Sequence, residues 1–170
     1  MNAARVAATI DAGDELSWIS VEVPPAVEAS FTVPGQYLEL GVEGLAPRPF
    51  AIASAPGQGS RLDFLVRASP GLAQALRRLK VGDPLTASKA LGPGFPLEQA
   101  RHRPLVLVAT GVGAAPMRSV IEAIAPRRGE FGDVTFYFGG RSGRDFPFER
   151  EWSRWQALGV TLVRSVSEED

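Results

Sequence analysis

The pattern of hydrophobic and polar positions changes character near residue 100. Before that point, short runs with hydrophobic residues at alternate positions are separated by Gly and Pro. Such runs are typical of β-strands in a small antiparallel barrel. The predicted strands are Arg5–Ile10, Leu16–Val23, Gln36–Val42, Pro49–Ser54, Leu62–Ala68 and Pro84–Lys89.

One short helix interrupts these strands. Leu72, Leu76 and Leu79 are spaced i, i+4 and i+7, which places them on one face of a helix. The basic side chains that accompany them at its end suit a helix C-terminus. The pattern predicts a helix from Leu72 to Leu79.

Strands and helices alternate after the polar segment 99–104, which reads as a linker. The pattern predicts strand 104–110, helix 115–125, strand 133–139, helix 148–157 and strand 160–166. This βαβαβ order is typical of a parallel, doubly wound sheet. We therefore expect an α+β protein of two domains, an antiparallel β-barrel over residues 1–98 and a partial doubly wound α/β domain over 103–170.

The predicted parallel sheet is small. Three strands are few for a doubly wound domain, so half of the expected sheet is missing and its first strand becomes a bare edge. An exposed apolar edge strand invites pairing with another chain. We therefore expect that this edge can support an oligomer.

Composition excludes several classes of partner and chemistry. The 170 residues are 45% hydrophobic and 22% charged, with a net charge of −1. Without a basic excess, nucleic acid and anionic membranes are excluded as main partners. The chain has no cysteine, which excludes disulfides, thiolate catalysis and iron–sulfur ligation, and its one histidine cannot build a metal cluster. Since no signal peptide or membrane-spanning run is visible, we expect a soluble, cytoplasmic protein.

The segment Thr110-Gly-Val-Gly-Ala-Ala-Pro116 follows a hydrophobic strand and precedes a helical pattern. Glycines let the backbone approach a ligand closely, and the free N–H groups of a helix start attract phosphate. Pro116 fits a first helical turn, where no N–H is required. The third glycine of the usual dinucleotide fingerprint is missing, so the motif also suits an ordinary tight strand–helix turn.

A second motif, Arg48-Pro-Phe-Ala51, lies on a predicted strand of the barrel. Residues 48 and 50 of an extended strand point to one face. An arginine and an aromatic ring on one face can bind a pyrophosphate and a flat heterocycle together. The alternative is a strand with a surface arginine and a core phenylalanine.

Taken in order, these motifs resemble those of the ferredoxin–NADP reductase-like flavoproteins over essentially the whole chain. Arg48–Ala51 resembles the family's flavin motif, and Thr110–Pro116 resembles its nicotinamide-nucleotide loop. The resemblance is nearest to the branch that includes the electron-transfer subunit of bacterial dihydroorotate dehydrogenase. Further matching segments are Leu62–Arg67, Gly71–Ala73, Leu79–Asp83, Gly92–Phe95 and Phe138–Arg141.

The resemblance implies an FAD site. Arg48 is expected to contact the FAD pyrophosphate, Phe50 to stack on the isoalloxazine ring, and the backbone from Ala51 onward to bond the polar edge of the flavin. Ala51 and Ala73 stand where the family usually has hydroxyl side chains, which weakens FAD binding without excluding it. The implied flavin-binding residues are Arg48, Pro49, Phe50, Ala51, Val66, Arg67, Gly71, Leu72 and Ala73.

The resemblance also implies a site for NAD(P)H. Glu168 follows a Val-Ser pair where relatives selective for NADPH carry arginine, and this favours NADH. Arg141 and Arg164 favour the opposite choice, and the acidic segment 168–170 also suits a solvated chain end. The implied nucleotide-binding residues are Thr110, Gly111, Gly113, Pro116, Gly139, Arg141 and Glu168.

The function implied is that of an FAD-dependent oxidoreductase. Hydride passes from NAD(P)H to flavin, and electrons continue to an unidentified acceptor, which can be a separate redox protein. The cofactors carry this chemistry, so no catalytic acid or base and no metal is expected. The family's later Cys-Gly-Pro-type loop does not occur in the sequence. The alternative is a catalytically inert flavin-barrel module that acts by binding a partner.

Overall fold

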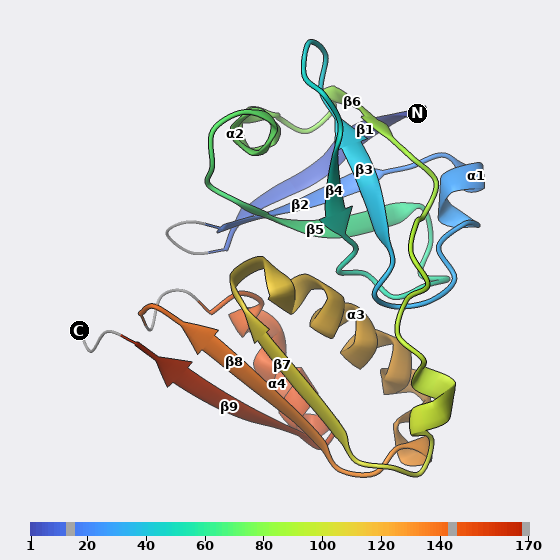
Figure 1. The fold of residues 1–170 in the computed structure, drawn as a ribbon, viewed down its shortest axis with the longest axis vertical. Coiled ribbons are helices and arrows are strands. Elements are labelled where there is room, and N and C mark those ends of the chain that lie inside the picture. The colour runs from blue at the N-terminus through green and yellow to red at the C-terminus, as the bar shows by residue number, and fades with distance from the viewer. Residues whose placement is uncertain (13–15, 143–145, 168–170) are drawn as a thin grey trace.

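The computed structural model describes residues 1–12, 16–142 and 146–167. Two sheets lie one above the other in Figure 1, with helix α3 between them. The first has six strands in the order β4-β3-β6-β1-β2-β5, and the second has three in the order β7-β8-β9. The six-stranded sheet is built from β1 (Asn2–Asp11), β2 (Leu16–Glu22), β3 (Tyr37–Gly41), β4 (Arg48–Ala51), β5 (Arg61–Arg67) and β6 (Pro84–Ala87).

All the pairings within the six-stranded sheet are antiparallel, as the sequence predicts. The sheet curves but does not close into a barrel. Its terminal strands β4 and β5 share no ladder, and a single bridge between Ile52 and Phe64 joins the two ends. Helix α2 (Leu72–Arg78) follows β5, close to the predicted bounds. A short helix that the pattern did not predict, α1 (Pro25–Glu28), follows β2.

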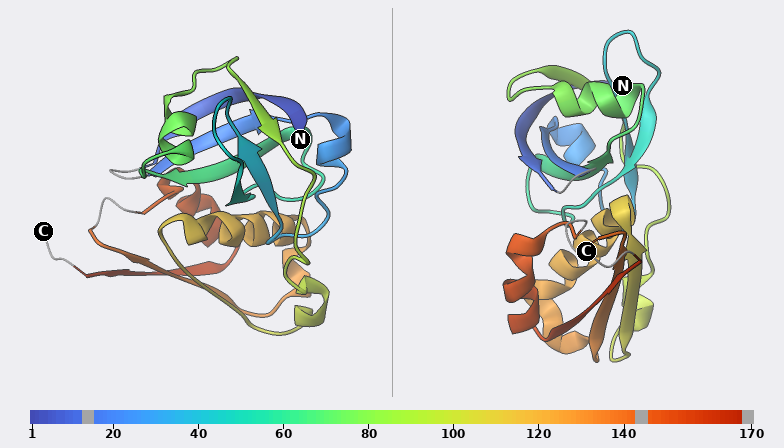
Figure 2. Two further views of the ribbon diagram at one scale, coloured as in Figure 1. Left: turned by 45° about the horizontal axis from the view of Figure 1, so that its top comes forward. Right: turned by 90° about the vertical axis from the view of Figure 1, so that its left-hand side faces the viewer.

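The second sheet is parallel, with strands β7 (Leu105–Thr110), β8 (Val134–Gly140) and β9 (Val160–Val166). Helices α3 (Ala114–Ile124) and α4 (Glu149–Ala157) connect successive strands and lie on the same face (Figure 2). The side chains that face them are buried, whereas Val106, Val108 and Tyr137 are exposed on the other face. Within the described residues, β7 is an edge strand, as expected.

Two hydrophobic clusters hold the fold together. One lies inside the six-stranded sheet and includes the fully buried Ile19, Leu38 and Phe64. The other fills the space between the parallel sheet and its helices, and it also includes Ala53 and Leu65 of the six-stranded unit. The second cluster therefore joins the two sheets, and it places the end of β4 against α3.

The segment between the two sheets is more ordered than a plain linker. It contains a 3₁₀ helix, η1 (Leu97–Ala100), and the N–H of His102 donates to the carbonyl of Glu130. Glu98 accepts hydrogen bonds from Arg127 (2.7 Å) and Arg101 (2.6 Å), and these lower the pKa of its carboxyl. Residues 125–130 form a further 3₁₀ segment, η3 (Ala125–Glu130). Hydrogen bonds and ion pairs therefore hold the connection between the two sheets in place.

Candidate functional site

A cavity of about 410 Å³ lies where the six-stranded sheet meets the start of α3. It brings together the two motifs that the sequence singles out. Its wall is formed by Arg48, Pro49, Phe50, Ala51, Leu65, Arg67, Ser69, Pro70, Gly71, Leu72, Ala73, Val112 and Ala115.

Strand β4 supplies one side of this cavity. It pairs with β3 so that Phe50 lies opposite Leu38 and Arg48 lies opposite Leu40. Phe50 is half-buried, with one part packed against the core of the six-stranded sheet and another lining the cavity. Arg48, two positions away, is exposed. This arrangement matches the predicted aromatic and cationic pair on one face of the strand.

Arg67, at the end of β5, provides a second cation at the same cavity. Its guanidinium lies over Gly111, where an added Cβ would collide with Nη2. Gly111 has a φ of +51°, in the left-handed region that favours glycine. Within the described part of the chain, the guanidinium groups of Arg48 and Arg67 have no hydrogen bond and no ion pair. Two unpartnered guanidinium groups at one cavity favour an anionic ligand.

Gly71 precedes α2 in a backbone conformation that side chains rarely adopt, with φ +85° and ψ −135°. Nothing lies within 4 Å of the position where a Cβ would stand. The backbone at Gly71 is therefore open to the cavity. Leu72 and Ala73 extend the same wall, Leu72 buried and Ala73 half-buried.

The glycine turn connects β7 to α3. Thr110 ends the strand, Gly111–Gly113 form a 3₁₀ turn, and α3 begins at Ala114, with Pro116 in its first turn. No side chain caps the start of α3. The N–H of Ala114, the first residue of α3, donates to the carbonyls of Gly111 and Val112 in the preceding turn, and Pro116 has no N–H. Gly113 has an ordinary φ of −62°, and a Cβ added there would stand 3.6 Å from the Cβ of Ala109, an ordinary van der Waals distance.

The carboxyl ends of the parallel strands lie side by side at this turn. Thr110 pairs in register with Gly139, and Gly139 with Ser165. In open α/β sheets, ligands bind outside these strand ends. Arg141 directly follows β8 at the same edge. Arg164 stacks instead against Phe146 and Trp152, with 5.4 and 5.0 Å from its guanidinium to the ring centroids.

Two predicted site residues need separate comment. Val66 is completely buried in the core of the six-stranded sheet, so its side chain does not line the cavity. Strand alternation explains this correction, because neighbouring residues point to opposite faces and the cavity receives Leu65 and Arg67 instead. Glu168 lies outside the described residues. The cavity residues that were not among the individually predicted site residues are Leu65, Ser69, Pro70, Val112 and Ala115.

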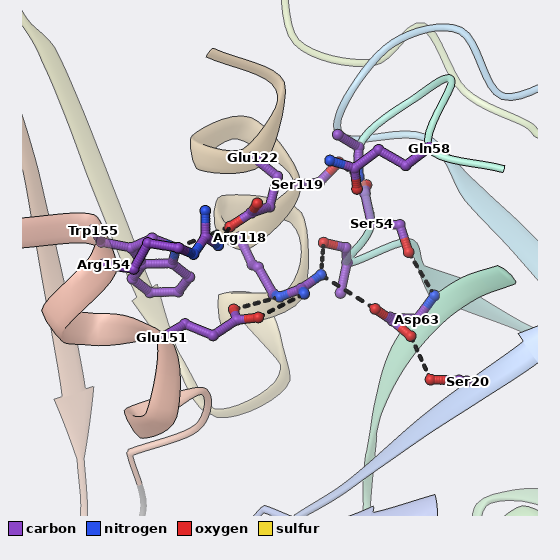
Figure 3. A network of polar contacts seen from close by, with 12 residues as sticks. Ser20, Ser54, Gln58, Asp63, Arg118, Ser119, Glu122, Glu151, Arg154 and Trp155 are labelled. Carbon is purple, nitrogen blue, oxygen red and sulfur yellow. Dashed lines mark hydrogen bonds and ion pairs between the residues drawn. The ribbon is translucent and has the colours of Figure 1, made fainter. Parts of the chain in front are cut away.

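A network of polar contacts crosses from α3 to the six-stranded sheet (Figure 3). Arg118 of α3 is only 8% exposed. Its Nη1 donates to the carbonyl of Ala53 (2.9 Å) and to Oδ2 of Asp63 (3.3 Å). Its Nε and Nη2 donate to the two carboxylate oxygens of Glu151 in α4, at 2.7 and 2.8 Å.

The surroundings of Arg118 keep it charged. Burial opposes the charge, but the hydrogen bond and charge of Glu151, together with the charges of Asp63 and Glu122, outweigh it and raise the pKa of Arg118 above its ordinary value. Two aromatic rings flank the guanidinium, with centroids at 4.7 Å for Trp18 and 5.3 Å for Phe148. Behind it, Glu122 accepts hydrogen bonds from Arg154 and from Nε1 of Trp155.

The sequence did not predict this network, although it contains a signal. Arg118 lies four residues after Ala114 and three before Ile121, both of which are buried on α3. A charged residue on the buried face of a helix requires a partner. In the part of the chain that the structure describes, no cluster of metal-ligating side chains occurs and no helix is long and apolar enough to cross a membrane.

Comparisons with known proteins bear on both halves of the chain. Residues 107–170 match the oxidoreductase NAD-binding domain family. The gamma subunit of sulfhydrogenase 1 from Pyrococcus furiosus is 29% identical over 158 residues, which cover 91% of this chain and 54% of that protein. The chain spans about half the length of the curated relatives it matches.

Solved structures show the same fold. The FAD/NAD-binding domain of nitric oxide dioxygenase from Vibrio cholerae has a TM-score of 0.83 at 21% identity, and the match covers 99% of this chain and 75% of that one. Ferredoxin–NADP⁺ reductase from Plasmodium falciparum has a TM-score of 0.81 at 14% identity, covering 97% of this chain and 70% of that one.

Proposed function

We propose that the chain is an NAD(P)H-dependent flavin oxidoreductase. Residues 107–170 match the oxidoreductase NAD-binding domain family, and the chain has the fold of solved reductases that bind FAD and NAD(P)H. FAD binds in the cavity beside β4. The nicotinamide nucleotide binds at the turn from Thr110 to Pro116. The proposed domains are residues 1–98 and 103–170.

The observation that carries this proposal is the shared cavity. Residues of the flavin motif and residues of the glycine turn are far apart in sequence, yet both line it. A reaction between two bound cofactors requires that their sites adjoin. The common wall made by Phe50, Ala51, Val112 and Ala115 supplies that adjacency.

The residues present suit FAD. Arg48 and Arg67 offer two unpartnered guanidinium groups for the diphosphate, and the half-buried ring of Phe50 offers a stacking surface. The unusual backbone at Gly71 leaves room for a ligand to approach. FAD, when bound, would take up the hydride of NAD(P)H and pass electrons to an acceptor. The chain itself binds, orients and shields the reactants, and no side chain moves a proton.

We propose NADH as the preferred nucleotide. Glu168 supports this choice because an acidic side chain accepts hydrogen bonds from a ribose 2′-hydroxyl and repels a 2′-phosphate. Arg164 is engaged with two aromatic rings and so offers weaker support for a 2′-phosphate site. Thr110, Gly111, Gly113, Gly139 and Arg141 complete the proposed nucleotide site.

The proposed electron acceptor is a separate redox protein. Because residues 1–170 contain no cysteine, they cannot themselves bind an iron–sulfur cluster that receives the electrons. A second candidate function is a module that binds a partner without catalysis. The exposed side chains of Val106 and Val108 on the edge strand β7 favour it, together with Ala51 and Ala73 at positions where hydroxyl groups are expected.

An anaerobic visible spectrum tests the proposal. Purified protein, incubated with FAD if colourless, should show flavin absorbance that bleaches with NADH and more slowly with NADPH. Flavin absorbance that persists with both nucleotides would support the partner-binding module. Failure to take up FAD would contradict the proposed cavity.

A further inference from the structure

Arg118 connects the elements that carry the two proposed cofactor sites through hydrogen bonds. It lies two residues after Pro116, in the first part of the helix that begins at the glycine turn. Its Nη1 donates to the carbonyl of Ala53, which lies two residues after the end of β4. One side chain therefore connects the nucleotide turn with the strand that carries the flavin motif (Figure 3).

The attachment point on the six-stranded sheet is itself held firmly. The N–H of Ala53 donates to the carbonyl of Asp63 (2.7 Å), and the N–H of Asp63 donates to Oγ of Ser54 (2.7 Å). The next residue of α3, Ser119, donates from its Oγ to the carbonyl of Ser54 (2.5 Å). Two successive residues of α3 thus donate hydrogen bonds to the carbonyls of two successive residues after β4.

We call the contacts of Arg118 with Ala53, Asp63 and Glu151 the joint. Arginine is the side chain that suits it. Its rigid fork carries five N–H donors, whereas lysine carries one flexible ammonium group. Here the fork meets Glu151 with two bonds while the remaining nitrogen bonds Ala53 and Asp63 across the joint. Trp18 and Phe148 meet edge to face, with centroids 5.1 Å apart, and both contact the same guanidinium. A lysine would lose the bidentate contact and shift the rings.

We propose that Arg118 is a positioning residue that sets the separation between β4 and the glycine turn, and so the spacing of the two cofactor sites. This inference rests on the proposed function. Arg118 contacts neither cavity nor turn, and it acts through Ala53 on one side and through α3 on the other. Because transfer between bound reactants is steep in distance, a displacement near 1 Å can slow it about 100-fold.

The test compares Arg118→Lys with Arg128→Lys. Arg128 is the matched control, since its guanidinium donates to the carbonyls of Phe131, Gly132 and Gly159 and does not reach the six-stranded sheet. We expect Arg118→Lys to retain FAD and to half-saturate at an unchanged NADH concentration. Its rate of flavin reduction at saturating NADH should fall about 10-fold to 100-fold. The control should keep the wild-type rate.

Hydrogen exchange provides a readout that needs no cofactor. The amides of Ala53 and Asp63 should exchange faster in Arg118→Lys, and at the wild-type rate in Arg128→Lys. This measurement tests the joint even if the wild-type chain takes up no FAD, a result that would overturn the proposed function alone. If Arg118→Lys does not fold, Glu151→Gln weakens the same fork and should show the same two effects.

Three results would overturn the proposal. The first is unchanged exchange at Ala53 and Asp63 in the Arg118 variant. The second is an unchanged rate of flavin reduction despite faster exchange. The third is loss of FAD in proportion to loss of activity, which would make Arg118 a determinant of flavin binding instead of spacing.

Discussion

The guanidinium of Arg67 lies against the backbone of Gly111, close enough to leave no space for a Cβ. This contact joins the end of β5 to the glycine turn across the candidate cavity. Gly111 also has a positive φ, and this backbone conformation is what favours glycine at this position, since the end of the flexible Arg67 side chain can move aside for a Cβ. A side chain added at Gly111 would therefore displace the guanidinium of Arg67.

Gly111→Ala should destabilise the protein by roughly 1–2 kcal/mol, the cost of a left-handed conformation for a residue with a Cβ. It should also displace Arg67 and weaken FAD binding. Urea unfolding and FAD titration measure the two effects. Gly113→Ala is the control, because Gly113 has an ordinary φ and room for a methyl group. Equal effects of the two substitutions would contradict the proposed contact.

Arg48→Ala should remove most of the bound flavin from the purified protein, because it deletes one of two cations at the cavity. Since Arg48 is exposed and lacks a partner within the described residues, stability should change by less than about 0.5 kcal/mol. The flavin-to-protein absorbance ratio gives the result. Arg61→Ala, at the other end of β5, should retain FAD, and normal FAD occupancy in Arg48→Ala would refute the assignment of this residue.

Gly113→Val should spare the flavin content and abolish bleaching by NADH. The protein has room for a side chain at this position, since only Ala109 lies near it, at 3.6 Å. A valine would therefore obstruct the nucleotide and not the fold. Anaerobic reduction by dithionite should still bleach the flavin. Bleaching by NADH at the wild-type rate would place the nucleotide elsewhere.

Ala73→Ser should strengthen FAD binding. Ala73 is half-buried in the cavity wall, and a hydroxyl there can supply a hydrogen bond to the ligand. A net gain of about 0.5–1.5 kcal/mol corresponds to an affinity about 2-fold to 10-fold higher. Ala75→Ser, on the same helix but outside the cavity wall, serves as the control in fluorescence titrations. Weaker binding in Ala73→Ser would mean that this wall contacts an apolar part of the ligand.

The stability contributed by Glu98, in the segment between the two sheets, should depend on pH. The hydrogen bonds from Arg127 and Arg101 lower the pKa of Glu98 below its ordinary value of 4.5 in the folded protein. Its contribution to stability is therefore present above that value and is lost as the pH falls through the lowered pKa. Glu98→Gln should lower the melting temperature near neutral pH and leave it unchanged at strongly acidic pH. A difference that persists in acid would exclude charge as its cause.

Most of the fold could be predicted because the strands and helices have clear periodicities. Helix α3 and the strands β7 to β9 differ from the predicted bounds by a residue or so. Closure of the six-stranded sheet was harder to predict, since it depends on whether β4 and β5 pair, and local pattern carries no information on that pairing. Helix α1 has four residues, too few for a periodicity to show.

The candidate site could be predicted only where residue type and local motif agree. Arg48, Phe50 and Gly71 line the cavity, whereas Val66 does not, because strand alternation turns it into the core. Asp63 could not be linked to Arg118 from sequence, because their contact depends on how the two sheets meet. The contact with Glu151 depends on how α4 packs beside α3. The finer assignment to the dihydroorotate dehydrogenase branch stays a prediction.

The joint around Arg118 also limits how freely the two halves of this protein can be recombined. A chimaera that combines the first half of one relative with the second half of another must keep an acidic side chain at Asp63 compatible with an arginine on the incoming helix. It must also keep Glu151 with that arginine, because a buried charge without a partner of opposite charge destabilises the contact between the two sheets. Asp63 precedes residues 99–104 and Arg118 follows them, so a recombination within that segment would succeed only between parents that share this ion pair.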